Sequence, residues 1–474
     1  MAVTNKAMII RRELFSRITK LLMEGRLVEQ IDRMPIELRP KNGELSRCCV
    51  YKDRAMLKYK IMALLGFSTR EDDEEITPLS TFAARALERD AISDIPLTVV
   101  DEACSACVRA NYVVTNMCRG CVARPCIVNC PKHAIRFDNG KAEIDSKQCV
   151  NCGLCMKNCP FHAIVYTPVP CEESCPVGAI SKDDEGIEHI DDTKCIYCGR
   201  CIMACPFGAV MEKSHLVEVV KAIKDENRKV VAMVAPAIAG QFKAPLGSII
   251  TAIRQLGFDD VIEVAAGADV TTANEAAEFV EKMAEGQAFM TTSCCPSYTE
   301  AARKHIPEVM PYVSHTRTPL YYTAQIARER YPDAALVFIG PCLAKRYEVY
   351  KDPNADYMVS FEELGAMFVA MNINVTESEQ EQLDASIDGS SRGYAVAGGV
   401  LAAVRKKLGD KVDIKPHYIS CLDKASIKEL RAFALKPTAN MVEVMACESG
   451  CVNGCNVVAN NKVAARQVRE LAEK

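Results

Sequence analysis

The residues 149–160, CVNCGLCMKNCP, and 195–206, CIYCGRCIMACP, decide how the middle of this chain folds. Both follow the spacing Cys-x2-Cys-x2-Cys-x3-Cys-Pro. Three closely spaced thiolates can wrap one face of a [4Fe–4S] cubane, while the fourth, carried away by the turn before proline, reaches a neighbouring cluster. Because such a run rarely arises twice by chance, we interpret both as cluster ligands.

Further cysteines around these two runs indicate an internal repeat. Residues 118–131, CRGCVARPCIVNCP, form a third run, in which four residues instead of two separate Cys121 from Cys126. This longer gap resembles the variant of the motif found in multi-cluster subunits of molybdenum oxidoreductases. A fragment, Cys171-x3-Cys175-Pro, has the last two positions of a fourth run, and a stray pair lies at Cys104 and Cys107. The ending Cys-Pro-x-x-Ala recurs four times, so we expect four copies of one half-unit. His133 and His162 lie in these endings, and we interpret both as structural.

Sixteen cysteines therefore fit four cubanes, in two modules that exchange their fourth ligands. The first module is expected to bind its clusters through two sets: Cys118, Cys121, Cys126 and Cys159, and Cys149, Cys152, Cys155 and Cys130. The second module is expected to use two more sets: Cys195, Cys198, Cys201 and Cys175, and Cys104, Cys107, Cys171 and Cys205. In the rival scheme the two full runs exchange with each other, and the other eight cysteines bind differently or not at all.

Composition limits the class of protein. The 474 residues are 49% apolar and 25% charged, with a formal net charge of −4, which is ordinary for a globular protein and does not favour a nucleic-acid surface. No apolar run reaches the roughly 18 residues that a membrane span needs. Residues 1–14 lack a signal-peptide core and cleavage site. We therefore expect a cytoplasmic protein whose 25 cysteines are reduced thiols that bind metal, because disulfide frameworks are typical of small secreted chains.

Cysteine density divides the chain into three expected domains. Residues 1–100 are predicted to be mostly helical, with helices at 8–31 and 54–65 and two structural thiols, Cys48 and Cys49. Residues 101–212 form the cluster domain, expected to be α+β. Residues 213–474 alternate apolar strands with amphipathic helices, which favours α/β layers with sites at strand ends. The expected strands lie at 230–234, 261–264 and 334–339, and the expected helices at 246–256 and 273–284.

The other candidate functional residues lie in three motifs of the last domain: TSCCP at 292–296, GPCLAK at 340–345 followed by Glu348, and EVMACESGCVNG at 443–454. Four of their thiolates could bind one more cubane: Cys295, Cys342, Cys447 and Cys451. Cys294 is then spare, and a thiol beside a redox cluster is a candidate proton donor. Lys345 offers a positive donor for an anionic ligand.

Together these motifs resemble the three signatures of the [FeFe]-hydrogenases, and the resemblance extends over roughly residues 101–460. It implies an α/β catalytic domain with two lobes around the H-cluster, joined to a ferredoxin-like domain with several cubanes. The chain lacks a Gly-Gly-Gly-Gln tail after the third motif and has Gly-Pro-Cys in the second. In both respects it is similar to the divergent group B enzymes, described as monomeric and ferredoxin-linked.

The resemblance assigns roles to individual residues. The H-cluster cubane would bind Cys295, Cys342, Cys447 and Cys451. Cys451 would bridge to a two-iron subsite with CO, cyanide and azadithiolate. Cys294 would pass protons to the bridgehead amine. Lys345 and the backbone near Ala235 and Pro236 would each hold a cyanide, and Met445 would lie beside the two irons.

The resemblance also implies a proton relay. Glu275 and Glu278 are three residues apart, hence on one face of a helix, and Thr318 stands where the family has serine. Lys282 stands where the family has a basic residue. The chain departs from the family pattern at three positions that change the surroundings of the metal site: Ala237, Gly340 and Cys455. We expect Cys455 to be inert and Cys421 to be a buried thiol.

The leading hypothesis is a cytoplasmic hydrogenase that exchanges electrons with ferredoxin and depends on hydrogenase maturation proteins. One alternative is a hydrogen sensor with the same cofactor and slow turnover. The sequence shows no PAS-like or kinase extension, which counts against this alternative. The other is a non-enzymatic cluster-assembly or electron-transfer protein. Retention of Cys294, Lys345, Glu275 and Glu278 argues against this last alternative, because a protein without the two-iron site needs none of them.

Overall fold

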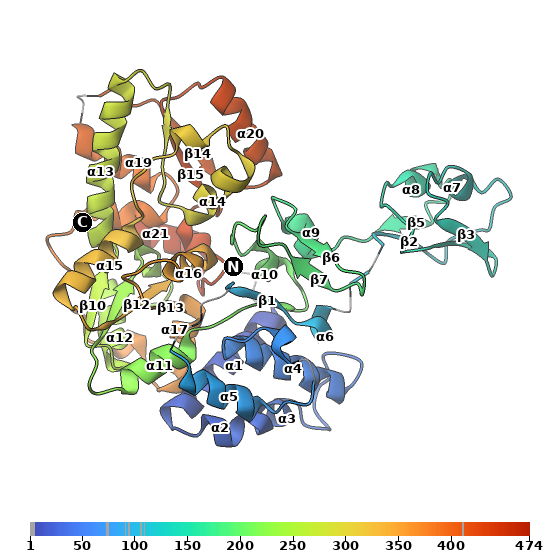
Figure 1. Cartoon of the computed structure of the whole chain (residues 1–474), viewed down its shortest axis with the longest axis horizontal. Helices are drawn as coiled ribbons and strands as arrows, with labels where there is room; N and C mark the ends of the chain where they lie inside the picture. The colour runs from blue at the N-terminus through green and yellow to red at the C-terminus, as the bar shows by residue number, and fades with distance from the viewer. Residues whose placement is uncertain are drawn as a thin grey trace.

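The computed structural model describes residues 5–72, 75–90, 92, 95–104, 107–108, 110–409 and 412–474. It contains a helical N-terminal part, two small cluster modules and a large α/β part (Figure 1). No described helix is both long enough and apolar enough to span a bilayer.

The N-terminal part is helical, as predicted. Its helices are α1 (Lys6–Met23), α2 (Leu27–Gln30), α3 (Met34–Leu38), α4 (Val50–Leu64) and α5 (Leu79–Glu88). The prediction of one helix over 8–31 was wrong. Gly25 has a φ of +70°, and the amides of Gly25 and Arg26 bond back to the carbonyls of Leu22 and Leu21, which ends α1 in a left-handed cap.

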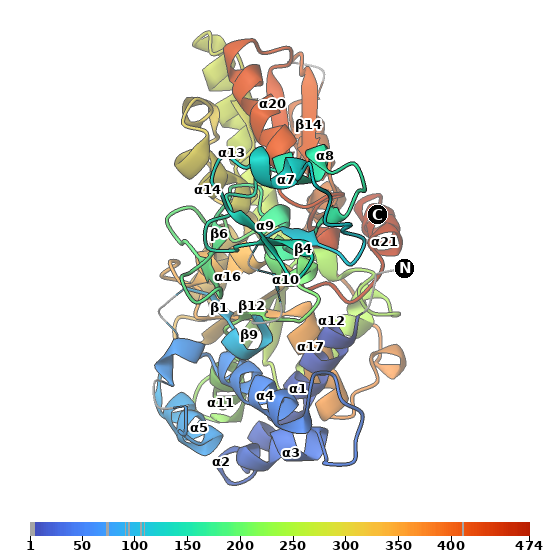
Figure 2. The ribbon, with the colours of Figure 1, turned by 90° about the vertical axis from the view of Figure 1, so that its right-hand side faces the viewer.

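Helix α1 packs along α17 (Phe361–Ala370) and α11 (Leu216–Lys224) of the α/β part. Its buried face repeats at helical spacing through Leu14, Ile18 and Leu22. Arg11 and Arg12 both form ion pairs with Glu362, whose side chain is 1% exposed. The N-terminal helices are therefore bound to the large part by apolar packing and by buried charge (Figure 2).

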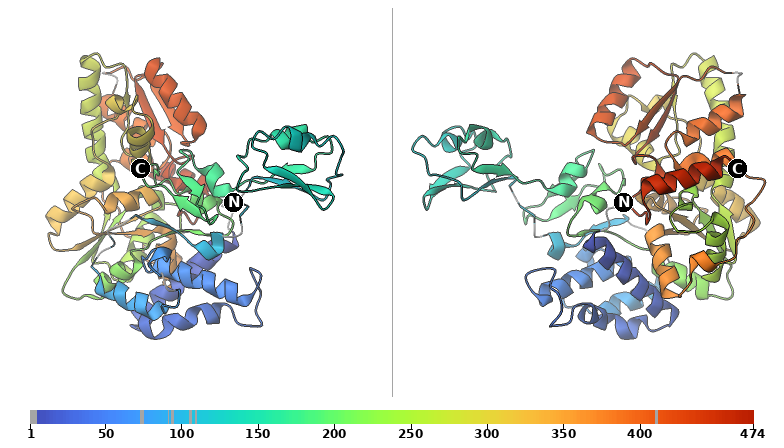
Figure 3. Two further views of the ribbon diagram at one scale, coloured as in Figure 1. Left: turned by 45° about the vertical axis from the view of Figure 1, so that its right-hand side comes forward. Right: turned by 180° about the vertical axis from the view of Figure 1, so that it is seen from behind.

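Residues 111–167 form what we call the distal module. Its elements are β2 (Tyr112–Val114), α7 (Pro125–Val128), β3 (Ile135–Asp138), β4 (Lys141–Ile144), α8 (Leu154–Asn158) and β5 (Ile164–Tyr166). β2 pairs antiparallel with β5, and β3 with β4. The module has an apolar core of its own around Ile135, Ala142 and Ile164. Two further views show it standing away from the rest of the chain (Figure 3).

Residues 168–212, with Cys104 and Cys107, form the proximal module. Its elements are α6 (Asp101–Cys104), α9 (Pro170–Ser174), β6 (Ile180–Lys182), β7 (Glu188–Ile190), α10 (Arg200–Ala204) and β8 (Val210–Glu212). β8 pairs with β1 (Leu97–Val99), and the module shares one continuous apolar core with the N-terminal helices and the α/β part. The proximal module is thus built into the body of the protein.

The α/β part has two parallel sheets. The first has the order β10-β9-β12-β13, with β9 at Val230–Val234, β10 at Asp260–Glu263, β12 at Ala335–Gly340 and β13 at Tyr357–Ser360. The second has the order β11-β15-β14, with β11 at Met290–Thr291, β14 at Pro416–Ser420 and β15 at Met441–Met445. β9, β12 and β15 are buried at every position, as central parallel strands require.

Helices flank both sheets. They are α12 (Leu246–Gln255), α13 (Ala265–Ala284), α14 (Pro296–His305), α15 (Pro319–Arg330), α16 (Leu343–Val349), α18 (Gly389–Arg392), α19 (Gly399–Leu408), α20 (Lys424–Leu435) and α21 (Asn461–Ala472). The strands predicted at 230–234, 261–264 and 334–339 and the helices predicted at 246–256 and 273–284 are confirmed to within a few residues, although α13 begins eight residues earlier than expected. The predicted fold class, an α/β part with two lobes beside an α+β cluster region and a helical N-terminal segment, is confirmed.

Candidate active site and cluster-binding sites

The three motifs of the α/β part all begin where a parallel strand ends. Residues 293–295 follow β11, Cys342 follows β12, and Cys447 follows β15. Ala235 and Pro236 follow β9 in the same way. Because the carboxyl ends of parallel strands are where open α/β sheets place their sites, the two sheets together define one candidate site.

A cavity of about 80 Å³ lies at this meeting point. The cysteines that line it are Cys294, Cys295, Cys342 and Cys451. The other sequence-predicted residues on its wall are Ala235, Pro236, Lys345 and Met445. Most of the remaining wall is apolar, including Leu320 and Phe338, and it also includes Tyr394. The structure therefore brings nearly all of the predicted cofactor-binding residues to one dry pocket.

Cys447 lies just behind this wall. Burial raises the pKa of Cys447 well above its usual value, and the neighbouring thiols of Cys342, Cys451 and Cys295 raise it further. Burial likewise raises the pKa of Cys451 to about 12, with Cys295 the next cause. Four thiols this close together resist ionisation unless a positive group enters among them, and a coordinated metal deprotonates a thiol outright. The donor set fits an iron–sulfur cubane.

Lys345 and Thr318 meet at Glu348. Lys345 Nζ lies 2.7 Å from Glu348 Oε2, and the Thr318 hydroxyl donates to Glu348 Oε1. Thr318 also caps α15 by accepting from the amide of Tyr321. Among the hydrogen bonds of the described residues, none joins Thr318 to Glu275 or Glu278. The structure thus places Thr318 apart from the relay in which the sequence put it.

Ser314, rather than Thr318, is the residue whose hydroxyl contacts Glu278. Its hydroxyl donates to Glu278 Oε2 at 2.6 Å, and the Glu278 carboxylate also accepts from the amide of His315 and lies 2.8 Å from Lys282 Nζ. Burial opposes ionisation of Glu278, but hydrogen bonds from Lys282 and Ser314 outweigh it and hold the pKa of Glu278 below its usual value.

Glu275 is fully buried one turn before Glu278 on α13. Its Oε1 accepts from the amide of Ser293, while its Oε2 has no hydrogen-bond partner among the described residues. Burial raises the pKa of Glu275 to about 8. After burial, the charge of Glu275 is the largest influence raising the pKa of the neighbouring Cys294. A carboxyl with a raised pKa beside the Cys294 thiol suits proton exchange between the two.

Sequence reasoning missed three polar residues near the pocket. Ser314 lies in the same Ser/Thr-rich segment as Thr318, and only the fold distinguishes them. Glu443, the first residue of the third motif, accepts the amides of Gly398 and Leu401 at the start of α19, and burial raises its pKa to about 7. Tyr394, whose hydroxyl lies 2.8 Å from Thr272 Oγ1, belongs to no motif and gave no signal.

The structure also groups the accessory cysteines. Burial raises the pKa of Cys201, and the thiols that raise it further include Cys198, Cys195 and Cys175. Burial raises the pKa of Cys171 to about 12, with further contributions from Cys205, Cys104 and Cys107. In the distal module, Cys126 interacts with Cys159 and Cys121, and a small cavity is lined by Cys130, Cys149, Cys152 and Cys155. Cys118 joins the same core.

These contacts are compatible with the four ligand sets that exchange their fourth cysteines, and the assignment of ligands to clusters stays a prediction. No three Cys, His, Asp or Glu side chains in the described part of the chain lie close enough to hold a single metal ion. The cysteines that bind a cubane lie farther apart than the ligands of a single ion, because each thiolate binds a different iron.

The recurring Cys-Pro-x-x-Ala ending has a structural reason. His133, His162, Gly178 and Gly208 occupy its fourth position, each with φ between +51° and +63°. This left-handed turn aims the following alanine amide at the sulfur four residues back, at 3.2–3.4 Å, in all four copies. An N–H donor stabilises a thiolate ligand. The two histidines are therefore found in a backbone role.

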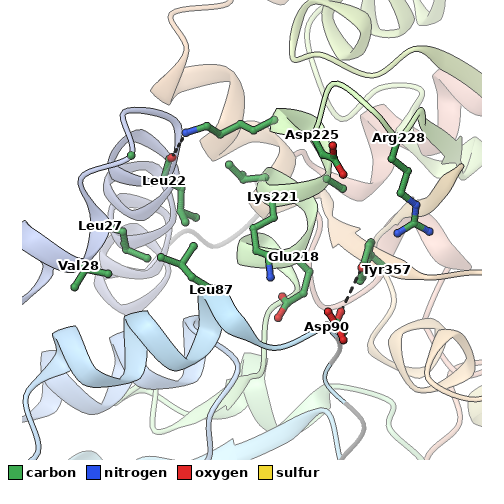
Figure 4. A pocket seen from close by; sticks show the side chains of 14 residues that line it. Leu22, Leu27, Val28, Leu87, Asp90, Glu218, Lys221, Asp225, Arg228 and Tyr357 are labelled. Atoms are coloured by element: carbon green, nitrogen blue, oxygen red, sulfur yellow. Dashed lines mark hydrogen bonds between the residues drawn. The ribbon is translucent and has the colours of Figure 1, made fainter.

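A wider cavity, of about 530 Å³, lies between the N-terminal helices and α11. Leu22, Leu27 and Leu87 face Glu218 and Lys221 across it (Figure 4). Glu218 is paired with Arg89 Nε at 2.6 Å, and Lys221 donates to the carbonyl of Arg89. Its wall contains none of the cysteines, and these contacts tie the two parts of the protein together.

Comparison with known protein families agrees with this site. Residues 228–455 match the C-terminal domain of the iron-only hydrogenase large subunit. Residues 117–163 match a 4Fe-4S dicluster domain, and residues 165–216 match the LdpA Fe-S cluster-binding domain. The first match covers both sheets and all three motifs, and the other two coincide with the distal and proximal modules.

Individual proteins give the same result. The chain is 29% identical over 308 residues to the NADP-reducing hydrogenase subunit HndD of Solidesulfovibrio fructosivorans, covering 52% of each chain. It is 26% identical over 300 residues to iron hydrogenase 1 of Clostridium pasteurianum, covering 51% of this chain and 52% of that protein. A solved [FeFe]-hydrogenase structure, on stepwise H-cluster assembly, aligns with a TM-score of 0.45 at 22% identity, over 55% of this chain and 88% of that one.

The fold and the pocket define an α/β protein with cysteine-rich modules of the iron–sulfur type attached. Its residues 228–455 are similar to the C-terminal domain of the iron-only, or [FeFe], hydrogenases. It spans about half the length of the curated relatives it matches.

Proposed function

We propose that the chain is a hydrogenase that interconverts protons, electrons and H2 (2 H⁺ + 2 e⁻ = H2). The observation that supports this most strongly is the pocket in which Cys294, which is not needed as a ligand, lies beside Cys295, Cys342 and Cys451, with Cys447 close to those three. A cluster that only carried electrons would need neither the fifth thiol nor the buried carboxyl of Glu275 beside it.

In this proposal Cys295, Cys342, Cys447 and Cys451 would hold an H-cluster. When bound, this cofactor supplies the metal centre at which the H–H bond is formed or broken. Lys345 and the backbone at Ala235 and Pro236 hold its anionic ligands, and Met445 packs against it. Glu348 keeps Lys345 in position through the 2.7 Å contact.

Protons reach the pocket through the side chains of α13 and its neighbours. Lys282 and Glu278 form the outer end, where Glu278 is partly exposed and hydrogen-bonded to Ser314. Glu275 and Cys294 form the inner end. This route replaces Thr318 with Ser314, because the Thr318 hydroxyl is bonded to Glu348 instead. Thr318 is then a positioning residue for Lys345.

Electrons enter or leave through four accessory cubanes, two in each module, which we propose exchange with ferredoxin or a similar low-potential carrier. Assembly of the two-iron subsite requires hydrogenase maturation proteins. All of the cysteines are unpaired thiols in the structure, and we propose a reducing, cytoplasmic setting for them. The group B subtype stays a prediction.

The proposed function is tested on chain matured with the two-iron cofactor, with reduced methyl viologen as electron donor. Cys294→Ala should lower H2 production about a hundredfold or more, because a positioned proton donor contributes roughly 10²–10⁴-fold. Cys421→Ala is the matched control and should retain activity, since Cys421 is a free thiol away from the pocket. Equal activity of Cys294→Ala and wild type would refute the role of Cys294.

A matured wild type that shows CO and cyanide infrared bands with negligible turnover would point to the hydrogen-sensor alternative. The absence of those bands would exclude both the enzyme and the sensor.

A further inference from the structure

The distal module is the most exposed cluster-bearing part of the protein. Its helices and strands pack against one another around a core separate from that of the body. Figures 1 and 3 show it projecting from the proximal module. An external protein can therefore approach its clusters from several sides.

The charge of the distal module is opposite to that of the whole chain. Residues 111–167 contain seven Lys and Arg and three Asp and Glu, a net side-chain charge of +4 in a chain of −4. Arg136 is neutralised by Glu143 at 2.8 Å. Among the described residues no ion pair involves Arg119, Arg124, Lys132 or Lys157. The two cubanes proposed for this module would add about −2 each and offset this +4, so attraction to an acidic partner would depend on local cations such as Arg119 and Arg124.

Exposed apolar side chains also gather on this module. Of the 25 large apolar side chains exposed in the described part of the chain, ten belong to residues 111–167. Four are exposed by more than half, and three of these lie beside or close to the proposed ligands of one cluster: Met117 (61%), Val122 (98%) and Val128 (76%). Exposed apolar groups interleaved with one sign of charge mark a protein-interaction surface rather than a solvated face.

The segment 117–124, which we call the docking loop, concentrates both features around Cys118 and Cys121. Arg119 and Arg124 flank Val122 in the sequence. The guanidinium of Arg124 stacks over the ring of Phe137 at 3.8 Å. At Gly120, with φ +55°, an added Cβ would lie 2.5 Å from the carbonyl oxygen of Gly140. The loop is thus fixed against the β3–β4 hairpin and presents its side chains in a preformed arrangement.

We propose that the docking loop is the docking surface for an acidic one-electron carrier protein, whose negative rim faces Arg119 and Arg124 and whose apolar centre covers Met117 and Val122. This inference rests on the proposed function. Each encounter moves one electron: the reduced carrier is oxidised by one electron, and the cubane of Cys118, Cys121, Cys126 and Cys159 is reduced by one. Two encounters and two protons account for one H2.

The test measures electron transfer into the accessory clusters and does not depend on H2 turnover. The chain, with its cubanes reconstituted, is mixed in a stopped-flow instrument with a reduced acidic ferredoxin, and the second-order rate of cubane bleaching is recorded against ionic strength. The wild-type rate should fall as salt rises, because steering between opposite charges is screened. Reduced methyl viologen, a small cation, serves as a partner that needs no docking surface.

Two loop variants and one control are compared. Arg119→Glu/Arg124→Glu and, separately, Val122→Glu should slow reduction by ferredoxin about tenfold or more at low salt. Val122 is 98% exposed, so its substitution cannot disturb the module's core. The matched control, Arg405→Glu/Lys407→Glu on the exposed last turn of α19, makes the same charge change and should stay within about twofold of wild type. All variants should react equally with methyl viologen.

Loop variants that accept electrons from ferredoxin as fast as wild type, or a control that slows equally, would overturn the proposal. So would binding of wild type, but not of the loop variants, to phosphatidylserine vesicles with no effect on the ferredoxin rate, because the surface would then bind a membrane. The proposed function fails separately, if the matured chain makes no H2 from reduced methyl viologen.

Discussion

Gly199 of the proximal module lies against Cys455 of the α/β part, close to the candidate site. Gly199 lies between the ligands Cys198 and Cys201, and Cys455 is buried beside Cys342 and Cys447. A Cβ on Gly199 would lie 2.5 Å from Cys455 Sγ, at a φ of +75°. The thiol that the sequence led us to expect to be inert therefore packs directly against the backbone of the proximal module.

Gly199→Ala should destabilise the folded protein by about 1–3 kcal/mol through overpacking, in addition to the cost of its positive φ. Gly178→Ala is the matched control, since Gly178 has a φ of +63° and nothing within 4 Å of an added Cβ. Thermal unfolding of the loaded protein measures both. Adding Cys455→Gly to Gly199→Ala should restore most of the clash component, and no coupling between the two substitutions would contradict the contact.

Glu275 is expected to make the free energy of unfolding depend on pH. Its pKa in the folded protein is about 8, above that of an ordinary glutamate, so the folded state binds the proton more tightly than the unfolded state. Its contribution to stability is complete below about pH 4.5 and is lost as the pH rises through 8. Between those limits, wild type should lose roughly 1.4 kcal/mol per pH unit relative to Glu275→Gln.

Denaturant unfolding of both proteins from pH 5 to pH 8 checks this prediction. Parallel stability curves would show that Glu275 is not buried as a neutral acid.

At the scale of elements, α1 depends on Glu362 of α17. Glu362→Gln should leave Arg11 buried without its charged partner and cost about 3–5 kcal/mol, with the N-terminal helices becoming sensitive to protease. Glu44→Gln removes an exposed ion pair with Lys6 and should leave the unfolding midpoint unchanged. If the two variants unfold alike, the N-terminal helices are not held to α17 by these charges.

The elements also show what a sequence can and cannot predict. Apolar runs long enough to be buried on both faces predicted β9 and β12 almost to the residue, because few other structures accept such runs. The helix expected over 8–31 failed at Gly25, where a left-handed cap outweighs the continuing apolar period. Ser314 and Thr318 are chemically equivalent in sequence, and only the packing of their segment against α13 decided which one bonds Glu278.

At the scale of the whole molecule, cysteine spacing predicts ligand groups, but it does not predict how the modules are arranged. Spacing is a local property, so it does not distinguish a module built into the main core from one with a core of its own. The charge reversal of the distal module was equally hidden in a chain with a net charge of −4, because the sum conceals where the charges lie.

The ligand groups predict the iron content. Protein made without maturation proteins and reconstituted with iron and sulfide should contain about twenty irons per chain, for five cubanes. Ala substitution of Cys104 and Cys107 together should remove about four irons. A wild-type count near twelve would contradict the scheme of two modules with two cubanes each.

The central claim is that the pocket between the two sheets holds a hydrogen-converting metal site. The measurement that tests it most directly is infrared spectroscopy of the matured chain, followed by an H2 assay with reduced methyl viologen on the same sample. The account predicts CO and cyanide bands together with H2 production, both lost when Cys451 is replaced by alanine. A fully loaded set of cubanes with no such bands and no H2 would contradict it.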